Sequence, residues 1–252
     1  MILTITNTKG GVGKTTTAVN VAAGLARKGR RTLLVDLDPQ AHATRCFLEE
    51  TPERDATDLI MDKPGMAARA VTPTDLAELD VVAASGRLNE TAELLATRIR
   101  REERLARALE RIREDYRYVV IDCPPSLGIL THNGIVAADL LLVPVQPGAG
   151  AVSGIRVLLD AAGELRDEDD VPFRILVTML DLRTSRTNAL FDELLQDVRK
   201  HLLRTFVARS ESINQANLAA RPVLLSAPSS RGAWDYESLC DEIVRLRVPT
   251  PA

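Results

Sequence analysis

The stretch TKGGVGKT, residues 8–15, decides the fold, because it places a glycine-rich turn between an apolar run and a long helical pattern. It approaches the pattern G-x-x-x-x-G-K-[ST], in which backbone N–H groups and a lysine cradle phosphates, although Thr8 replaces the first glycine. A second lysine, Lys9, stands five residues before the expected Lys14. One loop needs only one lysine for a triphosphate, so Lys9 needs a separate explanation.

The loop and the helix that follows it have the chemistry of a nucleotide site. The predicted helix 14–28 offers its positive N-terminus to the same anion as the loop. Lys14 can reach the β- and γ-phosphates, the Thr15 hydroxyl can bind Mg²⁺, and Thr16 is placed to contact the α-phosphate. The predicted nucleotide contacts in this segment are Lys9, Gly10, Gly11, Val12, Gly13, Lys14, Thr15 and Thr16.

Outward from this loop, short apolar runs alternate with helical patterns that fill most of the gaps, and the stretch 49–78 is the least regular. Several runs are apolar on both faces, which is typical of strands buried in a parallel sheet. The alternation predicts a single-domain, doubly wound α/β fold over residues 1–252, with a mostly parallel sheet flanked by helices. The glycine loop after its first strand adds the phosphate-binding loop of a P-loop NTPase. The expected strands are 2–6, 31–36, 79–84, 118–122, 140–145, 173–178 and 204–208. The expected helices are 14–28, 90–114, 151–166, 186–203, 211–219 and 233–246.

Carboxylates follow the second and fourth of these strands. Parallel strands place their carboxyl ends at one edge of the sheet, where ligands bind. Asp122 has the setting of a carboxylate that holds Mg²⁺, although a helix cap or a turn residue has the same setting. Asp36 and Asp38 are two apart on an extended segment, so we expect one to point toward the waters of Mg²⁺ and the other toward an attacking water.

The composition is that of an ordinary globular protein, with 45% hydrophobic and 27% charged residues. The net charge of -3 argues against a protein that coats nucleic acid by bulk charge, but a local basic patch is compatible with it. The three cysteines are far apart and lack metal-ligand spacing, which favours reduced thiols in a cytoplasmic protein. We expect no signal peptide and no membrane association, because no apolar run is long enough and the final RLRVPTPA is a poor anchoring helix.

Longer segments around these motifs resemble one family. The stretch KGGVGKTTTAVNVAAGLARKGRRTLLVDLDPQAHAT, residues 9–44, is similar to the deviant Walker-A ATPases of the ParA/Soj/MinD group, specifically the ParA/Soj chromosome and plasmid partition proteins. The segments VDLDPQ, IDCPPSLG, LLVPVQP and ILVTMLD follow in the family order. The resemblance covers nearly the whole chain and is strongest over residues 1–45 and 118–147.

The resemblance implies an ATPase that turns ATP and water into ADP and phosphate, slowly alone and faster with a partner. Two monomers would sandwich two ATP molecules and Mg²⁺ in an ATP-dependent homodimer. Lys9 would then contact the nucleotide of the partner subunit, as an arginine finger does in other NTPases; otherwise it is a solvent-exposed loop lysine. The implied catalytic residues are Lys9, Lys14 and Asp38. The implied metal-site residues are Thr15, Asp36 and Asp122, the last as the Walker-B carboxylate.

Two departures from the family concern the base site and a neighbouring loop. Met179 matches a position that lines the adenine pocket. A Pro-Arg-Asn segment usually completes that pocket, whereas this chain has Ala208-Arg209-Ser210, so Arg209 is the matching residue. After Gln146, many relatives carry acidic and aromatic residues, but residues 147–150 are PGAG. Both departures leave the predicted phosphate chemistry unchanged.

The resemblance also implies partners and a location. Relatives bind double-stranded DNA without sequence preference as the ATP dimer, and a ParB-type centromere-binding protein stimulates hydrolysis. The protein would then be cytoplasmic and nucleoid-associated. Dimerisation would double the number of contacts to DNA phosphates. The candidate DNA contacts are Arg209, Arg221, Arg231, Arg245 and Arg247. A further stripe on the predicted helix 90–114, with Ile99 on its buried face, is either DNA surface or a solvated helix face. Its members are Arg100, Arg104, Arg107 and Arg111.

Three alternatives stay open at this point. A ParA-like positioner of a protein cargo would bind DNA in the same way and differ only in its partner. A MinD-like membrane ATPase that places the division site would carry a C-terminal amphipathic helix, which we do not find in the sequence. A nitrogenase-reductase-like iron–sulfur protein shares the fold and Lys9 but needs paired cluster cysteines, and Cys123 has no suitably placed second cysteine.

Overall fold

The computed structural model describes residues 1–61, 67–148, 150–184, 189, 191, 193 and 195–246. Its strands are β1 (Ile2–Ile5), β2 (Thr32–Asp36), β3 (Val71–Pro73), β4 (Leu79–Val82), β5 (Tyr118–Asp122), β6 (Leu140–Val145) and β7 (Phe173–Val177). In this part of the chain they form one sheet in the order β3-β4-β2-β5-β1-β6-β7. Neighbouring strands run parallel, except that β3 is antiparallel to β4 at one edge.

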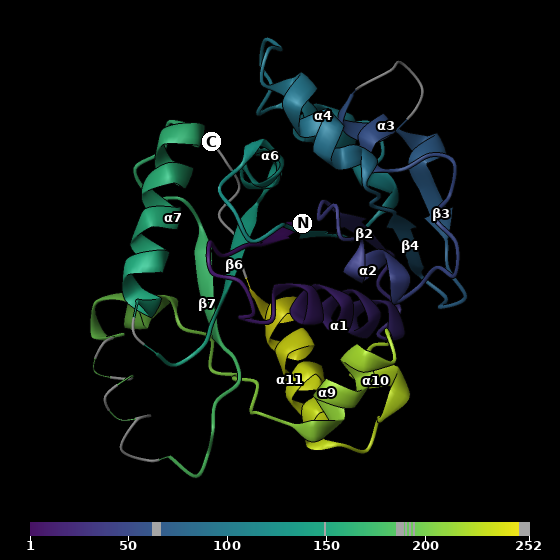
Figure 1. Cartoon of the computed structure of the whole chain (residues 1–252). Coiled ribbons are helices and arrows are strands. Elements are labelled where there is room, and N and C mark those ends of the chain that lie inside the picture. The colour runs from purple at the N-terminus through teal and green to yellow at the C-terminus, as the bar shows by residue number, and fades with distance from the viewer. Residues whose placement is uncertain are drawn as a thin grey trace.

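The helices lie on both sides of this sheet. They are α1 (Lys14–Arg27), α2 (His42–Arg45), α3 (Ala56–Ile60), α4 (Arg87–Leu95), α5 (Arg104–Leu109), α6 (Ile129–Ala137), α7 (Ala151–Arg166), α9 (Glu211–Leu218), α10 (Val223–Ser226) and α11 (Arg231–Arg245). Short 3-10 turns are Ala68–Ala70, Arg113–Asp115 and Gln196–His201. Figure 1 shows α1 with α9, α10 and α11 on one side of the sheet, and α3, α4 and α6 on the other. The doubly wound, mostly parallel α/β fold is therefore confirmed.

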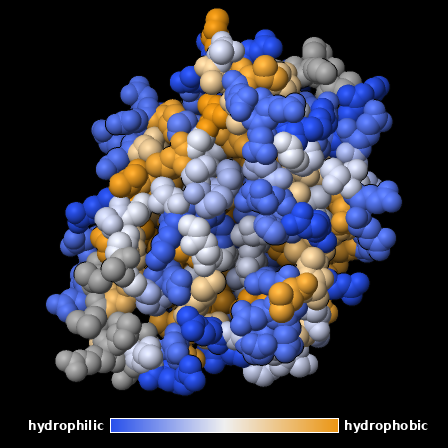
Figure 2. Space-filling view, viewed as in Figure 1, coloured by the Kyte–Doolittle hydropathy of each residue, from blue (hydrophilic) through white to orange (hydrophobic). Residues whose placement is uncertain are grey.

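The apolar runs are explained by burial on both faces of the sheet. Every residue of β1, β2, β4, β5 and β6 is buried. Successive side chains alternate between two cores, so that Leu34 packs in one of them while Leu33 and Val35 pack in the other. Hydrophilic residues dominate the face of the molecule in Figure 2, where hydrophobic residues gather mainly toward the upper left. Among the described residues, no helix is long and apolar enough to cross a membrane.

The N-terminal and C-terminal parts of the chain meet where α1 packs against α11. A β-carbon at Gly24 of α1 would lie only 2.5 Å from the Cys240 sulfur of α11, so this close approach requires glycine. The predicted helices 14–28, 151–166, 211–219 and 233–246 are confirmed to within two residues at each end. The C-terminal segment thus covers α1, directly behind the predicted nucleotide loop.

The prediction of one helix over 90–114 is wrong. Helix α4 ends at Leu95, Arg100 has a positive φ of 52°, and α5 begins only at Arg104. The Asn133 side chain of α6 accepts a hydrogen bond from Leu105 N at 3.0 Å and donates one to the Arg101 carbonyl at 2.8 Å, so it holds a chain reversal between the two helices.

The proposed arginine stripe therefore does not form on one helix. Ile99, which was expected on the buried face of that helix, is 85% exposed. Arg104 donates from Nη2 to the Ile99 carbonyl, and Arg107 pairs with Glu103 at 2.9 Å. Arg104 and Arg107 thus bond to neighbouring residues of the chain reversal and of the start of α5.

The prediction of a strand over 204–208 is also wrong, although the segment lies beside β7. Leu203 N donates to the Ile175 carbonyl, and Val207 N donates to the Val177 carbonyl, both at 2.9 Å. The N–H groups of residues 204 and 205 instead reach the Glu242 carboxylate of α11. Side chains of α11 thus replace the strand ladder. Most of the predicted helix 186–203 lies outside the described residues, and its C-terminal part is the 3-10 turn Gln196–His201.

Candidate functional site

The loop between β1 and α1 has the curled backbone that its glycines predict. Gly11 and Gly13 have positive φ angles of 74° and 87°, which non-glycine residues rarely adopt. Gly13 precedes α1, and no side chain caps the first turn of this helix. The N–H groups of that turn are therefore oriented toward the loop and suit an anion. Gly10 lies near Pro125, whose side chain comes within 4.0 Å of a β-carbon built on the glycine.

The two lysines of the loop have different surroundings. Lys14 is only 6% exposed, and its Nζ donates to the Lys9 carbonyl at 2.9 Å. Burial lowers the pKa of Lys14, while the charge of Asp122 acts in the opposite direction. Lys9 is exposed, and its side chain takes part in no ion pair within the described residues. Lys14 thus lies inside the loop, and Lys9 lies at its outer surface.

Two carboxylates meet at the carboxyl edge of the sheet, as predicted. Asp36 of β2 and Asp122 of β5 are register partners, and both are fully buried. Neither Asp122 oxygen has a hydrogen-bond partner in the described part of the chain. Burial first, and then the charge of Asp36, raise the pKa of Asp122, whereas the nearby Thr15 side chain lowers it. Buried acceptors without donors are costly, so this pair of oxygens suits a cation.

Asp36 and Asp38 point differently, as their spacing predicts. Asp36 accepts hydrogen bonds from Thr44 N at 2.9 Å, from Thr44 Oγ1 at 2.7 Å and from Asp38 N at 3.0 Å. Burial raises the pKa of Asp36 to about 6, although these hydrogen bonds oppose the shift. Asp38 is partly exposed, and its Oδ1 accepts from Gln40 N at 3.0 Å. Asp38 therefore stands nearer to solvent than the buried pair.

No group of three or more His, Cys, Asp or Glu side chains in the described ranges is arranged to hold a metal ion by itself. This fits Mg²⁺ chemistry, because Mg²⁺ usually keeps several waters and takes one or two carboxylates together with substrate phosphates. Of the three cysteines, Cys123 and Cys240 are buried, and burial raises the pKa of Cys240 to about 12. A thiol that stays protonated is a poor nucleophile and a poor metal ligand.

A cavity of about 250 Å³ lies beside Gly13, between the start of α1 and helix α9. It contains both residues predicted for the base site, Met179 and Arg209, and Met179 has the unusual φ of 52°. Thr16 Oγ1 donates to the Asn217 side chain at 3.2 Å across this cavity. Thr178 connects it to the loop, because its hydroxyl lies 2.8 Å from the Val12 carbonyl.

Sequence reasoning missed the part of this cavity that α9 supplies. Ile213, Asn214 and Asn217 line it together with Tyr236 of α11. Residues three and four apart share one face of a helix, so the spacing of 213, 214 and 217 was a usable signal. It carried little weight alone, because many surface helices show the same spacing. A second cavity, of about 310 Å³, lies on the Lys9 side of the loop and is lined by the start of α7.

The candidate DNA contacts are spread over the C-terminal part of the chain. Arg209 lines the cavity described above. Arg231 begins α11 and pairs with Asp235 at 2.7 Å, whereas Arg245 ends the same helix, roughly 21 Å away at 1.5 Å per residue. Arg221 is exposed just after α9, and Arg247 lies outside the described residues. Arg231 and Arg245 thus do not belong to one compact patch within a monomer.

Residues 1–175 match the family described as AAA domain. The chain is similar to the sporulation initiation inhibitor protein Soj of Bacillus subtilis, with 38% identity over 247 residues that cover 96% of this chain and 97% of that protein. It is also similar to the chromosome partitioning protein ParA of Myxococcus xanthus, with 35% identity over 254 residues that cover 98% of this chain and 89% of that protein.

Two solved structures are similar over nearly the whole chain. Cobyrinic acid a,c-diamide synthase from Mycobacterium smegmatis, with bound ATP analogue and magnesium, has a TM-score of 0.80 and 29% identity and covers 100% of this chain and 99% of that chain. The McdA–ATP complex of Cyanothece has a TM-score of 0.86 and 23% identity, covering 99% of this chain and 98% of that chain. At that identity the second likeness shows the fold alone.

Proposed function

Since this chain belongs to the ParA/Soj family of partition ATPases, within the ParA/MinD superfamily, we propose how it uses the site. It hydrolyses ATP with Mg²⁺, dimerises when ATP is bound, and binds double-stranded DNA without sequence preference in that form. A ParB-type partner stimulates hydrolysis, which returns the protein to monomers and releases the DNA. Repeated cycles then segregate a chromosome or plasmid.

The observation that carries this proposal is the convergence of two buried carboxylates on the lysine loop. Asp122 faces this edge with two unsatisfied oxygens, and Thr15 stands beside it, so these two residues suit Mg²⁺. Mg²⁺, when bound there, neutralises charge on the β- and γ-phosphates. Lys14 lies within the loop and can exchange the Lys9 carbonyl for phosphate oxygens. Similarity to a protein solved with an ATP analogue and magnesium supports the same ligands.

Asp36 and Asp38 lie where the waters of Mg²⁺ and the attacking water would be oriented. Asp36 is held by three donors, so its carboxylate is oriented before any ligand arrives. Asp38 is less buried and retains acceptor capacity, which suits a group that orients the attacking water. The cavity lined by Met179 and Arg209 lies directly beside Gly13, and its volume of about 250 Å³ leaves room for the base.

Lys9 supplies the step from monomer to dimer. Its ammonium group is exposed on the outer surface of the loop, while its carbonyl faces Lys14. A cation in this position can reach a nucleotide held by a second subunit, where it stabilises charge that develops on the phosphates. Without a triphosphate, two cationic loops would repel each other, so the dimer depends on ATP.

Cosedimentation of Asp38→Ala tests this function, because slow hydrolysis should hold the protein in its ATP state. The protein is mixed with random-sequence DNA or with anionic liposomes, in ATP or in ADP. Binding to DNA alone, in ATP only and weakening with salt, supports the proposal. Binding to liposomes alone would assign the protein to the membrane-associated branch of the superfamily, and binding to neither would remove DNA from the account.

A further inference from the structure

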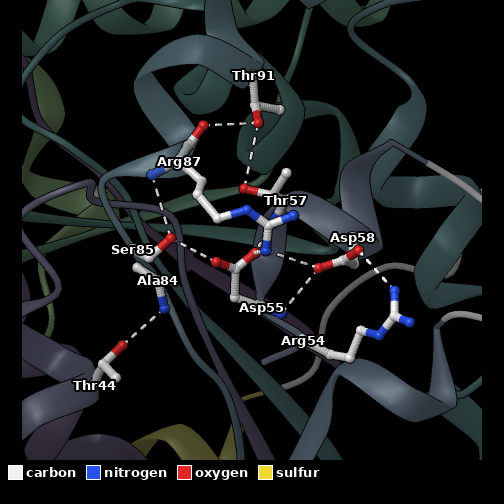
Figure 3. A network of polar contacts seen from close by, with 9 residues as sticks. All are labelled: Thr44, Arg54, Asp55, Thr57, Asp58, Ala84, Ser85, Arg87 and Thr91. Atoms are coloured by element: carbon white, nitrogen blue, oxygen red, sulfur yellow. Dashed lines mark hydrogen bonds and ion pairs between the residues drawn. The ribbon is translucent and has the colours of Figure 1, made fainter. Parts of the chain in front are cut away.

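The hydroxyl of Thr44 connects Asp36 to a turn on the other side of the metal edge. Thr44 lies in α2 and is 2% exposed. Its Oγ1 donates to Asp36 Oδ2 at 2.7 Å and accepts from Ala84 N at 2.8 Å, the contact drawn at the lower left of Figure 3. Because the Ala84 N–H can only donate, the single hydroxyl hydrogen is left for the carboxylate. The direction of both hydrogen bonds is therefore fixed.

The local fold explains why Thr44 reaches the end of β2. The chain reverses after Asp36, and Ala41 adopts a positive φ of 53° immediately before α2. This reversal brings the single turn of α2 back over the strand end, so that Thr44 N also donates to Asp36 Oδ2, at 2.9 Å. One carboxylate oxygen of Asp36 thus receives two donors from the same residue.

The turn that carries Ala84 is itself anchored by ion pairs and hydrogen bonds around two buried aspartates, shown in Figure 3. The Arg87 guanidinium lies 3.0 Å from Asp58 Oδ2 and 3.3 Å from Asp55 Oδ1, and both aspartates are almost fully buried. Ser85 Oγ donates to Asp55 Oδ2. Asp55 also accepts from Thr57 N at 2.9 Å, which caps α3. The position of the Ala84 N–H is therefore set by several bonds that do not involve the nucleotide loop.

We propose that Thr44 is a positioning residue that holds Asp36 for the magnesium-dependent part of nucleotide binding and hydrolysis. The proposal rests on the function proposed above. The hydroxyl fixes the rotation of the Asp36 carboxylate, and the Ala84 N–H prevents the hydroxyl from turning away. Thr44 does not touch the substrate, so it acts only through Asp36. Groups that orient metal-site carboxylates typically change metal affinity about 10- to 100-fold when they are removed.

Thr44→Val tests the proposal, because valine keeps the shape of threonine and removes only the hydroxyl. Thr44→Ser restores the hydroxyl without the methyl group. Thr91→Val is the matched control, since Thr91 belongs to the same network, is also 2% exposed and bonds to the Arg87 carbonyl rather than to Asp36. Thr44→Ala serves as a second variant if the valine variant folds poorly, with circular dichroism as the check on folding.

The measurement is ADP affinity by titration calorimetry, first in EDTA and then in Mg²⁺. We expect all variants to bind ADP in EDTA within about twofold of wild type, because Thr44 does not contact the loop that holds the phosphates. The gain in affinity on adding Mg²⁺ should fall about 10-fold or more in Thr44→Val and persist in Thr44→Ser and Thr91→Val. Under saturating Mg²⁺, the KM of Thr44→Val for ATP should rise along with the lost gain in affinity, and its kcat should fall.

Two results would overturn the inference. One is a full Mg²⁺-dependent gain in Thr44→Val. The other is an equal loss in Thr91→Val, which would assign the effect to general weakening of the network. If wild type itself gains no affinity from Mg²⁺, the metal site of the proposed function fails and this inference falls with it. If wild type gains affinity from Mg²⁺ and Thr44→Val gains as much, the role of Thr44 is refuted while the proposed metal site stands.

Discussion

Replacing Asp122 with asparagine should make the metal-free protein more stable while removing its response to Mg²⁺. The Asp122 carboxylate is fully buried without a hydrogen-bond partner in the described part of the chain, next to its register partner Asp36. Burial, and then the charge of Asp36, disfavour its ionised form and raise its pKa. Asparagine has nearly the same shape and no charge, so the substitution removes this repulsion and the cost of burying an ion.

The size of the effect follows from the cost of a buried unsatisfied group, about 1–3 kcal/mol and more for a charged one. The asparagine amide stays in the same poor hydrogen-bonding surroundings, so we expect only about 1–2 kcal/mol of stability to be gained. In a domain of this size, ~1 kcal/mol shifts the Tm by about 2–4 °C. The Tm of the metal-free protein should therefore rise by roughly 2–8 °C.

Calorimetric unfolding near neutral pH measures both parts of this prediction. In EDTA, Asp122→Asn should unfold at a higher temperature than wild type. Mg²⁺ with ADP should stabilise wild type beyond ADP alone, whereas Asp122→Asn should respond equally to both. Asp38→Asn is the control, because Asp38 is partly exposed and the change in its stability should stay within about 0.5 kcal/mol. A lower Tm for Asp122→Asn in EDTA, or a full response to Mg²⁺, would refute the reasoning.

Three further predictions concern the loop, the pH dependence and the chain reversal. Lys14→Ala should weaken ATP binding roughly 10- to 150-fold through lost charge-assisted hydrogen bonds, and unchanged affinity in a binding assay would contradict the phosphate loop. Burial raises the pKa of Asp36 from 3.8 to about 6, so the protonated carboxyl stabilises the folded state. This contribution to the free energy of unfolding is fully present below pH 3.8 and is lost as the pH rises through about 6. Urea unfolding in EDTA should therefore show about 3 kcal/mol less stability from this group above pH 6, with a flatter profile in Asp36→Asn. Asn133→Ala should cost about 2–4 kcal/mol in urea unfolding, because three hydrogen bonds of a buried side chain are lost, and it should leave ATP binding intact. Wild-type stability would show that Asn133 does not hold the reversal.

The sequence predicted the sheet well, and also the functional residues at the carboxyl ends of its strands, because both depend on local patterns. Strands buried on both faces must be apolar throughout, so β1, β2, β5 and β6 were found nearly to the residue. Asp36 and Asp122 follow from the same logic, since parallel strands end together. The glycine loop was found because few other residues tolerate the positive φ angles that it needs.

Two of the errors share a physical cause, namely side chains from distant segments that satisfy the backbone. The periodicity of 90–114 predicts one helix, but Asn133, 28 residues beyond Leu105, bonds to the chain reversal at Arg101 and to the start of the next helix at Leu105. Glu242 takes the backbone N–H groups that a strand over 204–208 would have used. The Thr44 bridge to Ala84 spans 40 residues and has no local signature. Such contacts appear only when the fold is known.

The central claim is that Lys9 completes the site of a second subunit when ATP is bound. Light scattering of Asp38→Ala in Mg²⁺ and ATP tests it most directly, with Lys9→Ala combined with Asp38→Ala as the comparison. We predict twice the mass of one chain for Asp38→Ala in ATP and the mass of one chain in ADP. The double variant should bind ATP yet keep the mass of one chain. A double variant that still forms dimers in ATP would contradict the claim.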